Sequence, residues 1–391
     1  MFKVVVAHSE DVDPLHIAED LIEQCQRQLS GRPVKVALLL STNHCEHQPL
    51  IDAINNAWRG IALIGGSTDG ELSSAIGFAD ASTALAIFSH DDSVQIVTGL
   101  GRNLSSDTKA ACAEAVASAR AKTSLPLRLC LALPESMTAN MAVVISSLTE
   151  LLGVDVPVFG GTTAGNTAGY PSGVAFKSTQ QFFGNEVLSD SLPIMLVAGN
   201  VISSSGVAGG WNSIGEVGTV TSSTGLVVQA IDNMPTLSFY KKQLGGVGVS
   251  KPEFPLAILD ANGGVDYFRA PNSLADNTRG VTFFGDVPMG ARVRITVGDR
   301  AAILQGCEAS IRMAKERFPA DGTPECALIF SCICRKLLLG TRTAEEAKLV
   351  ASHLGDVAFC GFYGYGEFAP SQEGQAAYYH NMTFVTVLLG S

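Results

Sequence analysis

The sequence lacks any stretch that would cross a membrane as a helix, which requires roughly 18 uninterrupted apolar residues. Its apolar beginning, "MFKVVVA", gives way at once to the polar "HSED", with no small-residue cleavage site of the kind that follows a signal peptide. This pattern is typical of a first β-strand. We therefore expect a cytoplasmic protein that does not insert into a membrane.

Charge is also scarce, and positive charge most of all. Only 16% of the residues are charged, and 26 Lys and Arg against 37 Asp and Glu give a net charge of −11. Binding to nucleic acid depends on clustered Lys and Arg that neutralise phosphates. The composition therefore argues against a nucleic-acid partner, although one local arginine is enough to attract a small anion.

Several signatures of metal sites and catalysis are missing as well. The nine cysteines include no CxxC pair, and several stand in apolar strand patterns typical of buried, reduced thiols. Cys332 and Cys334 alone do not favour zinc. "GGSTDGEL" has Asp69 where the GxSxG nucleophile motif requires glycine, and "GGVGVSK" fits neither a P-loop nor GxGxxG. The sequence thus disfavours a serine hydrolase and the common nucleotide sites.

What the sequence does contain is repetition. Residues 34–72, 127–166 and 324–368 each begin with a short apolar strand pattern and continue through a polar turn into helical spacing. Each then ends in a second apolar strand that runs into a glycine-rich corner, in "IALIGGSTDGEL", "VPVFGGTTAGN" and "VAFCGFYGYGEF". A strand, a crossover helix and a second strand make a βαβ unit with parallel strands.

Further apolar strand patterns follow the corners, at residues 82–100, 191–200 and 380–390. Their alternation and β-branched content suit antiparallel additions to the same sheet. The sequence therefore predicts an α/β fold of two domains with mixed β-sheets, built from repeated βαβ-plus-antiparallel-strand units.

The length of 391 residues also favours two domains. A Gly-rich connector near residues 225–240 predicts the boundary, so we place the first domain, with its linker, at 1–235 and the second at 236–391. A fourth, degenerate copy of the repeat, without a crossover helix, is expected at 254–297.

The glycine-rich corners are candidate ligand sites, because α/β sheets bind ligands at the carboxyl ends of parallel strands. Glycine lets the backbone approach a ligand closely, and successive N–H groups can hold an anion. Arg335, at a strand end, is suited to a carboxylate, Glu367 to an ammonium group, and Tyr365 to excluding water. The alternative is that the glycines only form tight turns, which an internal duplication would also preserve.

Three segments of the chain resemble the FIST family (F-box and intracellular signal transduction proteins) in the correct order. They are "ALIGGSTDGEL", the stretch from "GGWNSIGEVGTVT" to "IDNMPTLSFYKKQLG", and "ALIFSCICR…FCGFYGYGEFAP…HNMTFVTVLL". The resemblance implies a FIST N-terminal-like domain, a FIST C-terminal-like domain and an intracellular sensory module that binds small ligands such as amino acids. One branch of the family is associated with haem binding and nitric-oxide sensing through a partner histidine kinase.

The resemblance also marks positions for a ligand site. Asp69 stands where the family has alanine and adds negative charge to the first corner, and Asn166 takes the place of glutamate in the second. The positions carried over are Ser67, Thr68, Gly70 and Glu71 in the first half, and Cys332, Arg335, Tyr363, Gly364, Tyr365, Gly366, Glu367, His380, Asn381 and Thr383 in the second.

Haem would need an axial ligand, most often histidine. His380 lies in the shared "YYHNMT" motif, where a structural hydrogen bond is the favoured role, and His8 is a further candidate. His44 and His47 in "NHCEHQ" would share one face of a helix, but a solvated turn is the favoured interpretation of this segment. None of the seven histidines stands out as a metal ligand.

Taken together, these features predict a cytoplasmic sensor of an amino acid or similar polar metabolite, not an enzyme, with no cofactor. Its output would pass through a partner, such as a histidine kinase or another signalling protein. The first alternative is a haem-binding nitric-oxide sensor that regulates a histidine kinase. The second is an enzyme that uses Glu367 or Ser67. The favoured site is the C-terminal corner with Arg335, Tyr365 and Glu367.

Overall fold

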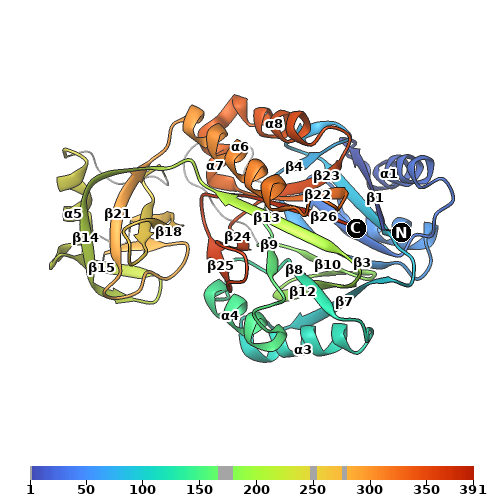
Figure 1. Ribbon diagram of the computed structural model, residues 1–391, viewed down its shortest axis with the longest axis horizontal. Coiled ribbons are helices and arrows are strands. Elements are labelled where there is room, and N and C mark those ends of the chain that lie inside the picture. Colours follow the sequence, from blue (N-terminus) through green and yellow to red (C-terminus); the bar gives the residue numbers. More distant parts are fainter. Residues whose placement is uncertain (1, 166–178, 247–252, 275–279) are drawn as a thin grey trace.

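The computed structural model describes residues 2–165, 179–246, 253–274 and 280–391. It shows a body of β-sheets covered by helices and a lobe of β-strands that projects from one side of this body (Figure 1). The α/β class with mixed sheets that the sequence predicts is confirmed. Within the described ranges, every helix is too short or too polar to cross a membrane.

The described residues of the body form three units with one plan, in which a strand and a helix precede the βαβ unit and a hairpin and a last strand follow it. Unit 1 (residues 3–89) contains β1 Lys3–Ser9, α1 Pro14–Leu29, β2 Val36–Thr42, α2 His47–Ala57, β3 Ala62–Thr68, β4 Glu71–Ser73, β5 Gly77–Ala79 and β6 Thr83–Ser89. Unit 2 (residues 94–199) contains β7 Val94–Arg102, α3 Thr108–Arg120, β8 Leu127–Ala132, α4 Met141–Leu152, β9 Val158–Gly161, β10 Gln181–Phe183, β11 Glu186–Leu188 and β12 Ser191–Gly199. Unit 3 (residues 202–208 and 300–390) contains β13 Ile202–Ala208, α6 Arg300–Arg317, β22 Pro324–Cys332, α7 Ile333–Leu339, η1 Gly340–Arg342, α8 Ala344–Leu354, β23 Ala358–Gly364, β24 Glu367–Pro370, β25 Ala377–His380 and β26 Phe384–Gly390.

The strands of the three units pair in the same order, β1-β6-β2-β3, β7-β12-β8-β9 and β13-β26-β22-β23. The two strands of each βαβ unit are parallel, namely β2 with β3, β8 with β9, and β22 with β23. The last strand of each unit lies antiparallel between the first strand and the second. The repeated βαβ-plus-antiparallel-strand units predicted from the sequence are therefore present.

The short hairpin after each glycine-rich corner leaves its own unit and extends the sheet of another. The hairpin β4–β5 pairs with β23 of unit 3, β10–β11 with β3 of unit 1, and β24–β25 with β9 of unit 2. The exchange runs in a circle, so a neighbouring unit completes each sheet and pairs the N–H and C=O groups along its edge. This exchange brings the glycine-rich corners, each of which precedes one of the hairpins, close together in space.

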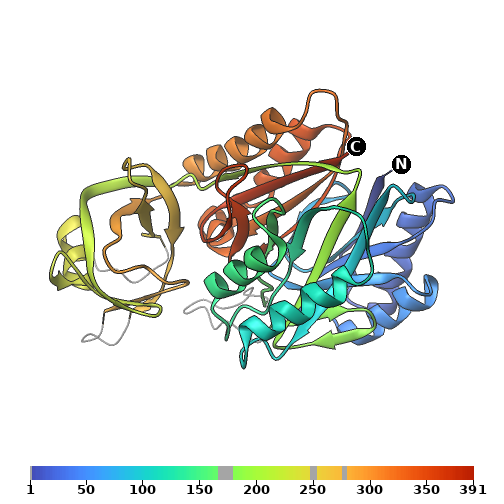
Figure 2. The same cartoon turned by 60° about the horizontal axis from the view of Figure 1, so that its bottom comes forward.

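The β-lobe, residues 212–297, is inserted into unit 3 between β13 and α6, and it stands apart from the body in both Figure 1 and Figure 2. Its described strands pair antiparallel, so the prediction of a fourth, degenerate βαβ copy at 254–297 is wrong. The physical reason is the missing helix, since parallel neighbours need a long crossover connection. The elements are β14 Asn212–Thr224, β15 Val227–Ile231, β16 Met234–Pro235, α5 Thr236–Gln243, β17 Leu256–Leu259, β18 Val265–Arg269, β19 Pro271–Leu274, β20 Val281–Phe283 and β21 Arg292–Val297.

The domain boundary proposed between residues 235 and 236 lies inside the β-lobe, between β16 and α5. Unit 3 therefore takes β13 from before that boundary and β22, β23 and β26 from after it. The strand pattern at 94–100 also behaves differently from expectation. It forms β7, which pairs with β12 and begins unit 2 instead of adding to the sheet of unit 1.

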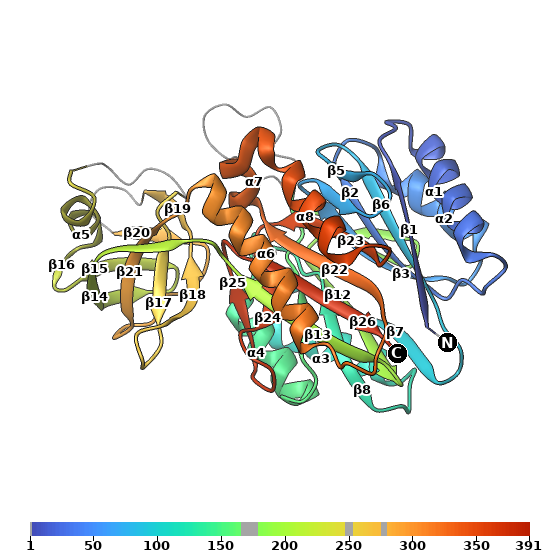
Figure 3. The same ribbon diagram turned by 45° about the horizontal axis from the view of Figure 1, so that its top comes forward.

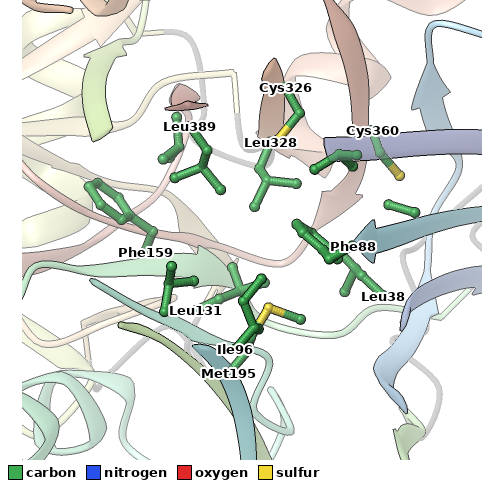
Figure 4. Close-up of a cluster of buried hydrophobic side chains, with 14 of the residues drawn as sticks. Leu38, Phe88, Ile96, Leu131, Phe159, Met195, Cys326, Leu328, Cys360 and Leu389 are labelled. Carbon is green, nitrogen blue, oxygen red and sulfur yellow. The ribbon is translucent and has the colours of Figure 1, made fainter. Parts of the chain in front are cut away.

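The inner faces of the three sheets share one hydrophobic core (Figure 4). Leu38 and Phe88 enter it from unit 1, Leu131 and Met195 from unit 2, and Leu328 from unit 3. Burial of each such side chain stabilises the fold by ~1.5–3 kcal/mol. Because every unit buries one sheet face in this common core, we infer that the body folds as a whole.

Helices cover the outer faces of the sheets, with α1 and α2 on unit 1, α3 and α4 on unit 2, and α6 and α8 on unit 3 (Figure 3). Helix α1 shows how the sequence specifies them. Asp13 caps its N-terminus by accepting hydrogen bonds from the N–H groups of Leu15 and His16, and Pro14 occupies the first turn. Ile17 and Leu21, one turn apart, face the sheet.

Candidate functional site

The glycine-rich corners of the three units meet, a relation that the sequence alone left open. The backbone N–H of Asp69 donates to the carbonyl of Tyr363 at 2.9 Å, and that of Ala164 donates to the carbonyl of Ser67 at 2.7 Å. The third pair joins units 2 and 3, where the N–H of Thr162 donates to the carbonyl of Gly366 at 2.9 Å. The predicted residues of both halves therefore lie in one cluster. Asn166, at the end of the second corner, lies outside the described residues.

Backbone geometry accounts for the glycines at these corners. Gly70 has a φ of +106°, in the region that favours glycine. At Gly366 a Cβ atom would lie 2.2 Å from the ring of Tyr379. Backbone conformation and close packing therefore explain the glycines at positions 70 and 366 without a ligand. The backbone amides of Asp69, Ala164 and Thr162 bond to carbonyl groups of other corners.

Glu71 is fully buried behind the first corner. Its two carboxylate oxygens accept hydrogen bonds from the hydroxyl groups of Thr68 and Ser82. Burial raises the pKa of Glu71 to about 8, so the carboxyl is largely protonated at neutral pH. Ser67 is buried as well, and its Oγ accepts from the backbone N–H of Gln180 at 2.8 Å. Groups of the protein itself therefore occupy the hydrogen-bonding positions of Glu71 and Ser67 that we had expected a ligand to take.

Glu367, the equivalent of Glu71 in unit 3, is buried too. Its Oε2 accepts hydrogen bonds from the N–H of Thr383 at 3.2 Å and from its hydroxyl at 2.6 Å. Oε1 is buried without a hydrogen-bond partner among the described residues. Burial raises the pKa of Glu367 well above its usual range, which favours the neutral acid. An enzyme that uses Glu367, the second alternative, would therefore depend on an acid that is only 1% exposed.

Arg335 has a different partner from the one expected. Its Nη2 lies 2.6 Å from Oε1 of Glu346, its Nε lies 3.1 Å from the same oxygen, and both side chains are completely buried. The carbonyl of Ile303 accepts from Nη2 at 2.8 Å, and the carbonyl of Gly209 accepts from Nη1. Glu346 therefore takes the place that we had assigned to a ligand carboxylate. In this structure Arg335 is a structural residue that ties α7 to α8 and α6.

The two tyrosines of the third corner are also engaged. Tyr363 donates its hydroxyl to Oε2 of Glu346 at 2.6 Å, and so extends the buried network of Arg335. The hydroxyl of Tyr365 lies 3.0 Å from both the N–H and the carbonyl of Gly165, which joins units 3 and 2. These side chains hold the corners together, and the ligand-contact role proposed for them stays a prediction.

One charged residue of the cluster was missed from the sequence. Nζ of Lys336 lies 2.6 Å from Oδ1 of Asp69 and 2.6 Å from Oδ1 of Asp80. The negative charge of Asp69, which seemed to disfavour an anionic ligand, is thus neutralised by a lysine of α7. The only signal for this contact was the pair of cations in "CICRKL", and nothing in the spacing connects it to the first corner.

The remaining predicted residues lead away from the corners, toward the β-lobe. Nε2 of His380 bonds to the carbonyl of Ala369 at 2.9 Å, and burial lowers the pKa of His380 to about 4, so the imidazole is neutral. Asn381 accepts a hydrogen bond from the N–H of Ala270, which belongs to the β-lobe. His380 and Thr383 line a cavity of 590 Å³ between the body and the β-lobe, here called the His380 cavity.

A second cavity, of 450 Å³, lies beside the first and is here called the Arg269 cavity. The two share Tyr267 of β18 and Tyr378 of β25, whose rings stack at a centroid distance of 5.7 Å. Together they form the lobe crevice, whose walls come from the β-lobe and from the body. Sequence reasoning missed it because its lobe side carries no recognisable motif; "YYHNMT" was the one signal for its body side.

The histidines do not gather into a metal site within the described residues. Nδ1 of His44 contacts the hydroxyl of Thr42 at 2.7 Å, and Nε2 of His47 contacts its carbonyl at 3.0 Å. His8 is buried, with Nδ1 2.7 Å from Oγ of Ser73 and Nε2 without a partner among the described residues. The metal assignment that the sequence left unknown therefore gains no candidate here.

Some solved structures resemble the chain weakly. A cyanuric acid hydrolase from A. caulinodans shares 8% identity, with 99% of each chain covered and a TM-score of 0.35. A second cyanuric acid hydrolase, whose description speaks of structural concatenation, shares 10% identity, with 99% of each chain covered and a TM-score of 0.35. PurLQS from Thermotoga maritima shares 10% identity, with 100% of this chain and 72% of that one covered and a TM-score of 0.22. Scores this low support no inference about this chain.

Comparison with protein families is decisive where comparison with single proteins is not. No curated protein matches the sequence. The model of the FIST N domain matches residues 35–234, and that of the FIST C domain matches residues 236–370. FIST domains are sensory domains that bind small ligands in signal transduction. Because these two matches cover most of the chain in the expected order, the chain belongs to the FIST family.

Proposed function

We propose that this protein senses an amino acid or a similar polar metabolite, which it binds in the lobe crevice. The observation that carries the proposal is the position of the two cavities, because their walls come from the inserted β-lobe on one side and the C-terminal motif on the other. A ligand held there contacts both parts at once. Its binding free energy can therefore be coupled to their relative position.

The chemistry of the His380 cavity suits a small polar ligand. Asp260 and Asp266 supply carboxylates, and the aromatic rings of Trp211, Tyr267 and Tyr378 supply apolar walls. Burial raises the pKa of Asp266, which indicates a partly desolvated carboxyl. Carboxylates beside aromatic faces attract ammonium groups. A cavity of 590 Å³ is within the usual range for small-molecule sites.

The connections of the β-lobe provide a route for output. Residues 209–211 lead into the lobe and residues 298–299 lead out of it. At the entrance Gly210 has a φ of +85°, and Trp211 donates its indole N–H to the carbonyl of Met382 at 2.9 Å. A change in the backbone at this junction would rotate the β-lobe as a rigid unit relative to the body. A signalling partner, such as a histidine kinase, would then recognise the lobe in one orientation.

The experiment is a thermal-shift screen of the purified protein against amino acids and related metabolites. A ligand that binds only the folded state at 100 times its Kd adds ~2.7 kcal/mol of stability. Asp266→Asn should reduce the shift, whereas Asp92→Asn, an exposed carboxyl outside the crevice, should leave it unchanged. If Asp266→Asn and Asp92→Asn bind the ligand equally strongly, and other substitutions in the crevice do not weaken binding either, the assignment is overturned. Saturable binding without product is expected, which separates a sensor from an enzyme.

A haem-based sensor is the second candidate, and it rests on His380. This neutral imidazole lines the His380 cavity, and the bond from Nε2 to Ala369 leaves Nδ1 without a partner among the described residues. A backbone carbonyl on one imidazole nitrogen commonly orients the other as a metal ligand. His380 would then be the residue that holds the iron of a haem in the crevice. Expression with haem supply decides the matter: a Soret band that disappears in His380→Ala supports haem, and its absence excludes it.

A further inference from the structure

The Arg269 cavity is built where three parts of the fold meet. The β-lobe contributes Arg269 and Asp286, helix α4 of unit 2 contributes Ile145 and Glu150, and the exchanged strand β25 of unit 3 contributes Tyr379. Charged groups of this cavity come from the β-lobe and from Glu150 of α4, and Ile145 of α4 and Tyr379 of β25 supply apolar walls. A ligand inside it would therefore contact each of these parts.

Arg269 lines this cavity and is only 3% exposed. Its Nε donates to the carbonyl of Asp286 at 3.0 Å, and its Nη1 donates to the carbonyls of Phe268 and Tyr379 at 3.0 and 2.7 Å. The guanidinium lies 4.2 Å from the ring centroid of Tyr267. These contacts fix the orientation of the side chain. Among the described residues, Nη2 has no hydrogen-bond partner and no carboxylate lies within ion-pair distance.

A buried cation in this state is exceptional, because burying a charge is costly unless an opposite charge pairs with it. Arg335 shows the usual solution in the same protein, since Glu346 bonds to both its Nε and its Nη2. At Arg269 the backbone carbonyls satisfy three N–H groups and leave the outer edge of the guanidinium open. An anion that enters the cavity would complete it.

Asp286 supplies the complementary feature. Its backbone carbonyl holds Nε of Arg269, but Oδ1 of its side chain is buried without a partner among the described residues. Leaving a buried acceptor unsatisfied costs about 1–3 kcal/mol. Glu150, on the exposed part of the lining, adds a second negative charge. A ligand with two negative charges is therefore disfavoured, and a ligand that pairs one negative charge with a hydrogen-bond donor is favoured.

We infer that the Arg269 cavity binds a small carboxylic acid that carries a donor, an ammonium or hydroxyl group, on the neighbouring carbon. The carboxylate bonds to Nη2 of Arg269, the donor bonds to Asp286, and the rest of the ligand lies against Tyr379 and Ile145. This inference rests on the proposed function, because it names the part of the lobe crevice that recognises the ligand. It also moves the carboxylate anchor from Arg335 to Arg269.

The test uses two sets of three matched acids and isothermal titration calorimetry of the full chain. L-Alanine, L-lactate and propionate share one skeleton, and L-phenylalanine, L-phenyllactate and 3-phenylpropionate share another. In at least one set, the amino or hydroxy acid should bind at least ~10-fold more tightly than the plain acid, a difference of about 1.4 kcal/mol. The corresponding amide, which has no carboxylate, should not bind measurably.

Three variants locate the contacts. Arg269→Gln should weaken binding at least ~10-fold for every acid of the set, as expected for the loss of hydrogen bonds to a charged group. Asp286→Asn keeps the backbone contact to Arg269 and should remove only the advantage of the amino or hydroxy acid over the plain acid. Arg292→Gln, at an exposed arginine of the β-lobe, is the matched control and should bind as the wild type does.

The outcomes separate this inference from the proposed function. Suppose that metabolites bind and that Asp266→Asn weakens their binding, while Arg269→Gln and Asp286→Asn fold and bind as the wild type does. Then the assignment of Arg269 as the carboxylate anchor is wrong, and the sensor proposal stands. If neither set of acids binds, the inference fails, and if the wider screen also finds no ligand, the proposed function fails with it. If Arg269→Gln does not fold, equal preferences in Asp286→Asn and the wild type would still overturn the inference.

Discussion

Replacement of Arg335 by methionine should destabilise the whole protein, because the structure makes this arginine one half of a buried ion pair. Met has a similar unbranched stem but no charge, so Glu346 would remain in the core without its cation. The two side chains are 0% exposed and their charged atoms lie 2.6 Å apart. Solvent cannot compensate the carboxylate that remains.

The expected cost is about 3–5 kcal/mol, the usual penalty for removing one partner of a buried pair. Glu346 would retain the hydroxyl of Tyr363 at 2.6 Å and that of Ser331 at 3.3 Å. Those two bonds suit a neutral side chain as well as a charged one. The double variant Arg335→Met with Glu346→Gln should therefore be more stable than Arg335→Met alone by at least ~2 kcal/mol, because no unpaired charge is then buried.

Urea unfolding followed by circular dichroism measures both changes. The matched control is Arg312→Met on α6, whose guanidinium pairs with Glu316 at 3.6 Å while both side chains are 66% exposed. An exposed pair of this kind contributes at most ~0.5 kcal/mol. If Arg335→Met kept wild-type stability and lost only ligand binding, the structural role would be refuted and the original ligand assignment restored.

Three further predictions concern the corners. Glu71→Gln should remove one component of the pH dependence of stability: burial raises the folded pKa of Glu71 from 4.5 to about 8, so its contribution is fully present below pH 4.5 and is lost as pH rises toward 8, and thermal melts of the variant should lack this part of the decline. Gly366→Ala should cost about 1–3 kcal/mol in urea unfolding, because the new Cβ would overlap the ring of Tyr379, and unchanged stability would show that the ring moves freely. Lys336→Met should lower the melting temperature by leaving Asp69 buried without its cation, and Lys336→Met with Asp69→Asn should recover part of that loss; equal stability of the two would argue against the pair.

Local patterns allowed much of the body to be predicted from the sequence. Strand alternation, helical spacing and glycine-rich corners are all encoded within a few residues, and they identified the βαβ core of each unit. The sequence also has helical spacing at residues 108–122 and 300–318, and these segments correspond to α3 and α6. The first strand was also expected, in "MFKVVVA", and β1 extends from Lys3 to Ser9. These elements follow from hydrophobic periodicity alone.

The exchange of hairpins and the position of the β-lobe were beyond local patterns. The hairpin β4–β5 pairs with β23, almost three hundred positions away in the chain, and nothing in "ELSSAIGFA" selects that partner. The lobe separates β13 from the rest of unit 3, so the first strand of the third repeat stands beside a segment of different architecture. A window of one repeat does not reveal either relation.

The site was predicted in part for the same reason. The sequence showed that the corners occupy equivalent places in equivalent units, but neither their convergence nor the partners of individual side chains followed from it. Arg335 at a strand end has the pattern of a ligand anchor, and only the packing of α8 brings Glu346 onto it. The local sequence "YFRAP" does not indicate a ligand role for Arg269, because the groups around this side chain come from β25 and from the segment around Asp286.

Hydrogen exchange with and without a ligand from the screen tests most directly whether the protein senses that ligand between body and β-lobe. The account predicts slower exchange in peptides that contain β18, residues 265–269, and β25, residues 377–380, and unchanged exchange in α1 on the far side of unit 1. Protection confined to the glycine-rich corners, with β18 and β25 unaffected, would contradict it.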